Sequence, residues 1–248
     1  MSPLSVEWED PATTILALLL CGHVLAVFLF ESNWMIRKDM PSLRGFVVHA
    51  LKVGLVQGVV VLAFSWSVRG LLLVGGIALT HLALDRIRFS LDRRYPRHGV
   101  WWLLGDQAAH ACVLLSAWKM WTVPEGAGSA PVIGWAATLL AVIVFNGNGG
   151  SAIVARTLAS MDVPKEESGD EDKGPEGAGR KIGILERWMI LGLVCAGQWG
   201  AVGLVLTAKS IARFKKMDQQ AFAEVYLVGT MTSILVAMLS GTLLRLVL

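Results

Sequence analysis

Long apolar stretches separated by short polar segments run through the whole chain. A helix needs about 20 mostly apolar residues to cross a hydrocarbon core of roughly 30 Å. About seven segments approach this length, and they are Thr13–Phe30, Gly45–Phe64, Gly70–Leu84, Val100–Trp121, Val132–Phe145, Ile182–Thr207 and Val225–Val247. The pattern therefore predicts an all-α fold, a polytopic transmembrane helix bundle with about seven spans.

Two polar interruptions divide this pattern. The first, Asn-Gly-Asn-Gly-Gly at 146–150, is typical of a helix stop, and the apolar stretch after it is expected to lie in the interface or to re-enter the membrane. The second, at 163–181, is acidic and rich in Gly and Pro, which predicts a disordered cytoplasmic linker. The predicted parts are a four-helix membrane bundle (1–124), a fifth span with a broken or interfacial helix (125–162), the linker (163–181) and a two-helix membrane unit (182–248).

Composition supports a membrane protein and indicates its orientation. The chain is 54% hydrophobic, and its mean hydropathy of +0.59 is too high for a soluble domain. The net charge of +3 is small, so nucleic acid is not implied as a partner. If the N-terminus is outside, about fifteen basic residues fall inside and six outside. This favours an outside N-terminus and a cytoplasmic C-terminus, with most exceptions at 209–216.

Two pairs of ionisable residues interrupt the apolar segments. His81 and Asp85 are four residues apart, as are Asp106 and His110, so each pair shares one face of its helix. Ionisable side chains cost several kcal/mol at bilayer depth unless they pair, bind an ion or line a wet cavity. Both pairs are therefore candidates for a functional site.

The alternating direction of consecutive spans predicts that these pairs meet two further histidines. His23 lies near the end of the first span and His49 near the start of the second. The end of one span and the start of the next lie in the same leaflet. All six residues are therefore expected near one membrane face, the cytoplasmic face by the charge distribution, with Glu31 at its edge.

Imidazole and carboxylate groups are ligands of zinc and manganese. The residues expected to bind a divalent metal are His23, His81, Asp85, Asp106 and His110. His49 and Glu31 would then act as acid or base, and the bound metal would generate hydroxide for hydrolysis. Three alternatives stay open: a proton relay in a transporter or carrier, polar contacts that only pack helices together, and a structural or signalling module whose acidic linker recruits a partner.

Basic residues gather at the same face, and among them are Arg86, Arg88, Arg93 and Arg94. Such residues commonly anchor the cytoplasmic ends of spans. A second interpretation is contact with a lipid headgroup or another phosphate-bearing substrate, because arginine offers a bidentate fork to phosphate oxygens.

Four motifs carry a family resemblance, and they follow one another as GHVLAVFLFESNWMIRK, VVHALK, THLALDRIRF and LLGDQAAH. In this order they resemble an uncharacterised bacterial membrane family catalogued as domain of unknown function 3307, over about residues 15–120. The resemblance implies a protein of the bacterial inner membrane. The architecture is also similar to predicted membrane-bound metal-dependent hydrolases, which implies a hydrolase.

The family's first motif, H-x-x-x-D-F-x-x-Q, is altered in this chain. His23 and Phe28 match it, whereas Val27 stands in place of Asp and Glu31 in place of Gln. The chain therefore lacks one acid that the family pattern would supply to a metal. The later motif residues His81, Asp85, Asp106, Gln107 and His110 all agree with the pattern.

Overall fold

A computed structural model describes residues 7–30, 43–64, 67–121, 130–161 and 178–247. These residues form helices and contain no β-strand, so the predicted all-α fold is confirmed. The α-helices are α1 (Pro11–Val24), α2 (Leu43–Phe64), α3 (Val68–Arg94), α4 (Gly99–Met120), α5 (Pro131–Val144), α6 (Gly150–Ala159), α7 (Ala178–Cys195), α8 (Trp199–Arg213) and α9 (Gln220–Val247). Glu31 and most of the predicted 163–181 linker lie outside the described residues.

Among the described helices, five are long and apolar enough to cross a membrane. They are Pro11–Leu29, Leu43–Phe64, Val68–Arg94, Pro131–Ala159 and Phe222–Val247. The predicted number of about seven spans is therefore not confirmed. The predicted spans that are not among the five are Val100–Trp121, now helix α4, and Ile182–Thr207.

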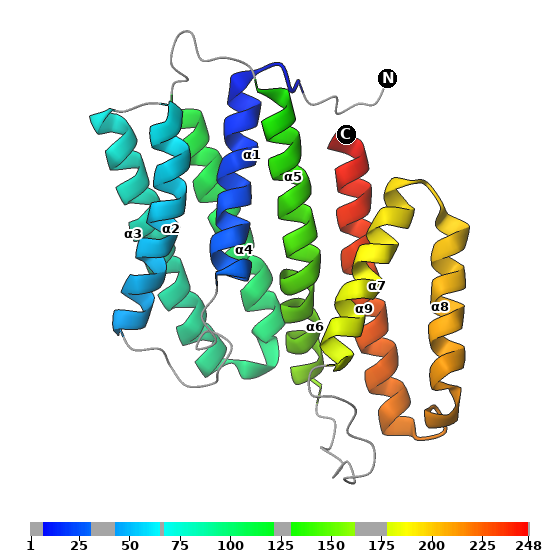
Figure 1. Cartoon of the computed structure of the whole chain (residues 1–248). Helices are drawn as coiled ribbons and strands as arrows, with labels where there is room; N and C mark the ends of the chain where they lie inside the picture. The colour runs from blue at the N-terminus through cyan, green and yellow to red at the C-terminus, as the bar shows by residue number, and fades with distance from the viewer. Residues whose placement is uncertain (1–6, 31–42, 65–66, 122–129, 162–177, 248) are drawn as a thin grey trace. The chain divides into compact units, whose positions relative to one another are not determined.

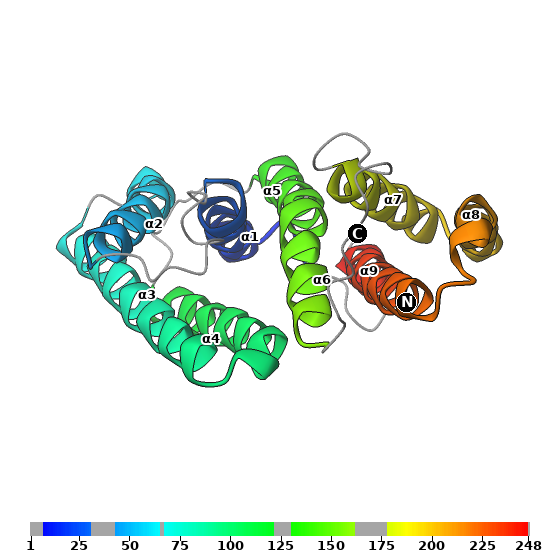
Figure 2. The same ribbon diagram turned by 90° about the horizontal axis from the view of Figure 1, so that it is seen from below.

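Contacts divide the chain into two units, unit 1 up to Val144 and unit 2 from Phe145. In unit 1, α1 packs against α5, α2 and α4, while α3 packs against α2 and α4 (Figures 1 and 2). Successive helices run in opposite directions (Figure 1). Unit 1 therefore holds the four predicted helices and also α5, and the division lies at Val144 rather than in the linker.

The Asn-Gly-Asn-Gly-Gly segment does not stop the helix. Phe145–Gly149 forms one turn of π-helix that carries the chain from α5 into α6. Pro131–Ala159 is therefore a single membrane-length helix. The predicted stop is wrong because the segment's glycines make room for another helix: a Cβ added at Gly150 would lie 2.7 Å from Nε of Arg187 in α7.

The predicted span Ile182–Thr207 is also wrong, because the chain turns back in its middle. Gly197 has φ +71°, a conformation that favours glycine. The N–H of Gln198 donates to the Leu193 carbonyl at 2.8 Å, and that of Gly197 donates to the Val194 carbonyl at 2.9 Å. These two bonds form a Schellman motif that ends α7. Unit 2 therefore contains α6, α7, α8 and α9, and the C-terminal part expected to hold two helices holds three.

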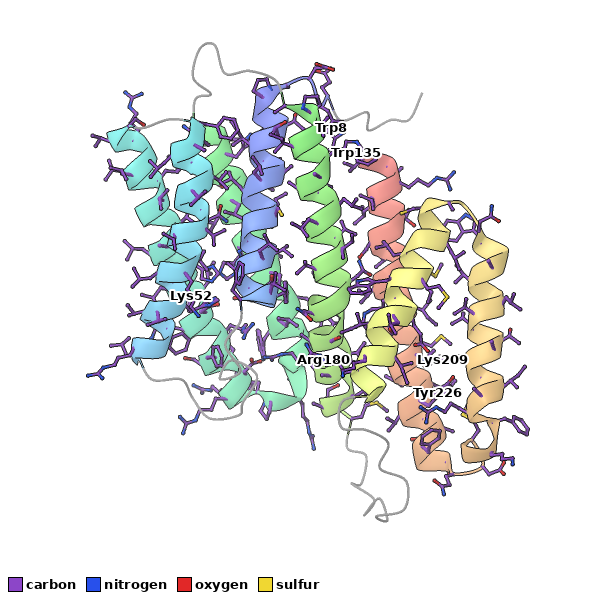
Figure 3. The ribbon with its side chains drawn as sticks, viewed as in Figure 1. Trp8, Lys52, Trp135, Arg180, Lys209 and Tyr226 are labelled. Atoms are coloured by element: carbon purple, nitrogen blue, oxygen red, sulfur yellow. The ribbon has the colours of Figure 1, made fainter. Side chains whose placement is uncertain are left out.

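This turn determines the relative direction of the helices in unit 2. Helices α7 and α9 run in the same direction and α8 runs against them (Figure 1). Lys209 of α8 therefore lies at the same end of unit 2 as Arg180 at the start of α7 (Figure 3). Arg245, near the end of α9, lies at the opposite end, close to Gly197. The start of α7 and the C-terminal end of α9 therefore lie at opposite ends of unit 2, and the side of the membrane on which each lies stays a prediction.

Candidate functional site

Helix geometry places the predicted site residues on inward faces of unit 1. In α3, His81, Asp85 and Arg88 follow one another at i, i+4 and i+7, and in α4 Asp106 and His110 lie in the stripe of buried positions. His49 lies in the second turn of α2 and His23 in the last turn of α1. All these side chains are only 2–8% exposed. We define the His/Asp site as His49, His81, Asp85, Asp106 and His110.

On one side of the site, α2 and α3 bring two histidines to one carboxylate. Nε2 of His81 lies 3.4 Å from Oδ2 of Asp85, and Nε2 of His49 lies 3.7 Å from the same oxygen. Ligands of one tetrahedral zinc ion, with bonds of about 2.0–2.2 Å, lie about 3.4 Å apart. The two distances therefore fit a shared metal ion with little movement.

On the other side, α4 adds a second carboxylate and a third histidine. Nδ1 of His110 lies 2.8 Å from the backbone carbonyl of Asp106, so this nitrogen carries the proton and donates it. In the neutral ring the lone pair is then on Nε2, which has no hydrogen-bond partner among the described residues. Oδ1 of Asp106 has none there either.

Asp85 belongs to both sides. The ligand atoms of His49, His81 and Asp85 lie within 4.8 Å of one another, and so do those of Asp85, Asp106 and His110. The chain could therefore hold a metal ion in either group. His23 of α1, which was predicted to be a ligand, belongs to neither group.

His23 was predicted to be a metal ligand. In the structure its ring belongs to a series of side-chain contacts that runs through Gln107 to Asp106. The Gln107 amide donates from Nε2 to Oδ2 of Asp106 at 3.0 Å, which turns its Oε1 towards Nε2 of His23 at 3.4 Å. Because Oε1 only accepts, Nε2 of His23 must donate. His23 and Gln107 therefore hold Asp106 from outside the site. Gln107 agrees with the family motif, but its spacing predicts no contact with Asp106, since neighbouring residues on a helix do not share a face.

The imidazole rings confirm the predicted meeting of the four helices. The centroids of His81 and His110 are 4.2 Å apart, and those of His49 and His81 are 5.1 Å apart. The His23 ring lies 5.0 Å from that of His110 and 5.5 Å from that of His81. Histidines from α1, α2, α3 and α4 therefore reach the same level of unit 1.

The basic residues at this end of unit 1 differ in how far their side chains are exposed. Arg86, Arg93 and Arg94 are exposed, as the predicted headgroup contact requires. Arg88 is only 6% exposed, and its NH1 lies 3.7 Å from Oδ2 of Asp106. Arg88 is therefore part of the interior. Val27, where the family pattern has Asp, is buried at the end of α1 in a turn of π-helix, Leu25–Leu29.

General magnitudes make buried charges candidates for a functional site. A charged side chain at the centre of a membrane helix costs about 2.5–3.5 kcal/mol on insertion scales, a cost that falls towards the helix ends. A polar contact between membrane helices returns about 0.6 kcal/mol on average. Buried Asp85, Arg88 and Asp106 are therefore functional candidates on these scales, and helix packing stays the alternative.

Residues 15–135 match the model of a family described as Protein of unknown function (DUF3307), which confirms the resemblance carried by the sequence motifs. No curated protein matches the chain, and no solved structure does.

Proposed function

Because the family whose model matches residues 15–135 has a description that assigns no activity, we propose a function from the site itself. The His/Asp site binds a divalent metal ion, zinc or manganese, within the membrane. A metal ion held there would supply a water of lowered pKa for the hydrolysis of a lipid or a phosphorylated headgroup. The single observation that carries this proposal is the pair of buried ligand groups that share Asp85.

The donor set suits such an ion. Two histidines and one carboxylate with an open fourth position are the ligands of several zinc hydrolases, and the ion lowers the pKa of its bound water to about 7. His49, His81 and Asp85 supply this set from α2 and α3. In this assignment His49 is a ligand rather than the acid or base that the sequence indicated. Asp106 and His110 complete the coordination or face the bound water.

The location of the site favours a substrate that comes from the cytoplasmic side of the membrane. At the end of unit 1 nearer the site lie Arg44, Arg86, Arg93, Arg94 and Arg97. The opposite end carries Arg69 and Lys119. By the positive-inside rule the first end is cytoplasmic. The exposed Arg86, Arg93 and Arg94 are placed to contact a phosphate-bearing headgroup there.

The test is the metal content of the full-length protein purified in detergent. Wild type is expected to retain or take up zinc or manganese, and His81→Gln and Asp85→Asn are expected to lose it because each removes a shared ligand. His98→Gln is the matched control, since His98 is exposed in the turn before α4. Folded wild-type protein that takes up neither metal would contradict the proposal.

A second candidate function is a proton relay in a carrier. The observation that favours it is the continuous series of four imidazole rings, with neighbouring centroids 4.2–5.1 Å apart. In proteoliposomes this function predicts a pH-dependent flux that Asp106→Asn abolishes and that a chelator leaves intact. A flux that requires added metal would favour the hydrolase site instead.

A further inference from the structure

Arg88 is a buried cation that donates no hydrogen bond to the residues that the structure describes, while its guanidinium carbon lies 4.9 Å from the centroid of the Phe89 ring. Its side chain is 6% exposed, and its Nε has no acceptor among the described residues. The nearest carboxylate oxygen, Oδ2 of Asp106, lies 3.7 Å from NH1, which is longer than a hydrogen bond. The same oxygen already accepts from Gln107 at 3.0 Å. Arg88 therefore has a charge inside unit 1 and donors available for a ligand.

Arg187 in unit 2 is a buried arginine whose three guanidinium nitrogens all donate hydrogen bonds within the protein. It is 2% exposed, and its guanidinium donates to the carbonyl oxygens of Asn146 and Gly147. It also donates to the hydroxyls of Ser151 at 2.6 Å and Ser233 at 3.1 Å. A buried arginine in this chain can thus find hydrogen-bond acceptors for its guanidinium. The unused donors of Arg88 need a separate explanation.

The charges of the His/Asp site indicate what that explanation is. Asp85 and Asp106 supply two negative charges, and Arg88, which stays protonated in proteins, supplies one positive charge. A divalent cation would bring the sum to one net positive charge in a poorly solvated interior. Either a metal-bound hydroxide or an anionic ligand would neutralise it, but only an anionic ligand with several oxygens would also accept from the guanidinium of Arg88. Charges buried without a partner are costly, so the site is expected to take an anion.

We infer that Arg88 binds an anionic ligand at the His/Asp site and that this ligand carries a phosphate group. The inference rests on the proposed function because it names the substrate class of the same site. A guanidinium pairs with two oxygens of an oxyanion through its planar fork. A carboxylate would have no oxygen left for a metal ion, whereas a phosphate group keeps further oxygens for it. The phosphate could belong to a lipid headgroup or to a free phosphate compound.

The experiment measures phosphate binding by the detergent-purified full chain, with and without added zinc. The first probe is inorganic phosphate, followed by equilibrium dialysis. The variants are Arg88→Gln, which removes the charge, and Arg88→Lys, which keeps the charge but loses the fork. Arg69→Gln is the matched control because Arg69 is exposed on the same helix, at the end away from the site. Thermal unfolding of each variant confirms that it folds.

We expect Arg88→Gln to bind phosphate at least about tenfold more weakly than wild type, since a hydrogen bond to a charged group contributes about 1.5–3 kcal/mol. Arg88→Lys should retain part of the affinity, and Arg69→Gln should equal wild type. Equal binding by wild type and Arg88→Gln, or no binding by folded wild type with and without zinc, would overturn the inference.

A second pair of probes separates the two sources of phosphate. Phosphatidic acid in mixed micelles should displace inorganic phosphate if the ligand is a lipid headgroup, and diacylglycerol, which lacks the phosphate, should not. Displacement by neither lipid, with binding of inorganic phosphate still dependent on Arg88, supports a free phosphate compound. If phosphate binds in an Arg88-dependent way but no metal binds, the proposed hydrolase fails while the anion site stands.

Discussion

Unit 1 and unit 2 each bury an arginine, and the two differ in what surrounds the charge. Arg187 in unit 2 meets four oxygens, two of them carbonyls of a π-helix. Arg88 in unit 1 meets no hydrogen-bond acceptor among the described residues and lies beside two carboxylates and three histidines. The contrast teaches that burial of a charge does not by itself indicate function. A buried charge indicates a ligand site when the protein supplies it with few hydrogen-bond acceptors.

The different surroundings follow from the local sequence. In a π-helix the carbonyls are displaced from the regular i to i+4 pattern, so some can accept from outside the helix. The Asn-Gly-Asn-Gly-Gly segment provides such carbonyls, and its small residues let the Arg187 side chain approach. Around Arg88 the chain instead provides ionisable side chains. Four predictions, from the largest expected effect to the smallest, test this contrast.

Replacing each arginine should separate the two regions most clearly. Arg187→Met leaves the carbonyls of Asn146 and Gly147 without their donor, at about 1–3 kcal/mol for each buried group. We expect a loss of about 3 kcal/mol or more in the free energy of unfolding. The double variant Arg88→Met with Asp106→Asn removes both charges of the buried ion pair, so no carboxylate loses its cation, and it should cost less than about 1 kcal/mol. Denaturant unfolding in detergent measures both, and equal losses would contradict the contrast.

Zinc binding should stabilise unit 1 against unfolding, and this stabilisation should require the Asp85 carboxylate. At a free zinc concentration one hundred times the dissociation constant, a ligand bound only to the folded state contributes about 2.7 kcal/mol. We expect a corresponding rise in the unfolding temperature of wild type and none in Asp85→Asn. The Arg187→Met protein should still respond to zinc, because that substitution lies in unit 2. A zinc response that survives in Asp85→Asn would place the metal elsewhere.

Crowding Arg187 should have the same effect as removing part of its contacts. In Gly150→Ala the new Cβ would lie 2.7 Å from Nε of Arg187, so the guanidinium must shift. We expect a loss of about 2 kcal/mol, within the range for an overpacked interior. Gly192→Ala in α7 is the control, since nothing lies within 4 Å of its Cβ. Unfolding curves that coincide for the two variants would show that Arg187 adapts freely.

The turn between α7 and α8 should show the smallest effect. Alanine at position 197 must adopt φ +71°, which costs a non-glycine residue about 1–2 kcal/mol. We expect Gly197→Ala to lower the free energy of unfolding by about 1 kcal/mol and Gly200→Ala to leave it unchanged or raise it slightly. A similar response of both variants would argue against a glycine-specific turn.

Much of the candidate site was predictable from the sequence because local rules determine it. The four-residue spacing of His81 with Asp85 and of Asp106 with His110 fixes a shared helix face. The alternation of helix direction then brings His23 and His49 to the same level. What the rules could not supply is detail of side-chain partners. Only the structure shows that Gln107 engages His23. The three-residue spacing of Asp85 and Arg88 could have indicated that Arg88 shares the inward face.

Unit 2 was predicted less well because its key contacts join distant positions. Arg187 is 40 residues from Gly147 and 46 from Ser233 along the chain. No periodicity in the segment around 187 indicates these partners. The glycine-rich segment was therefore interpreted as a helix stop, and Gly197 was overlooked within an apolar stretch. With α8 turned back, Lys209 pairs with Glu186, a contact that a single long helix would forbid.

The order of the Arg187 acceptors along the chain has a consequence for biosynthesis. Helix α7 is not among the helices that are long and apolar enough to cross a membrane by themselves. Asn146, Gly147 and Ser151 are all translated before Arg187, whereas Ser233 is translated after it. Three of the four acceptors have thus left the ribosome when the arginine emerges. Its entry into the bilayer can be assisted by a helix already in place, and α9 then completes the enclosure.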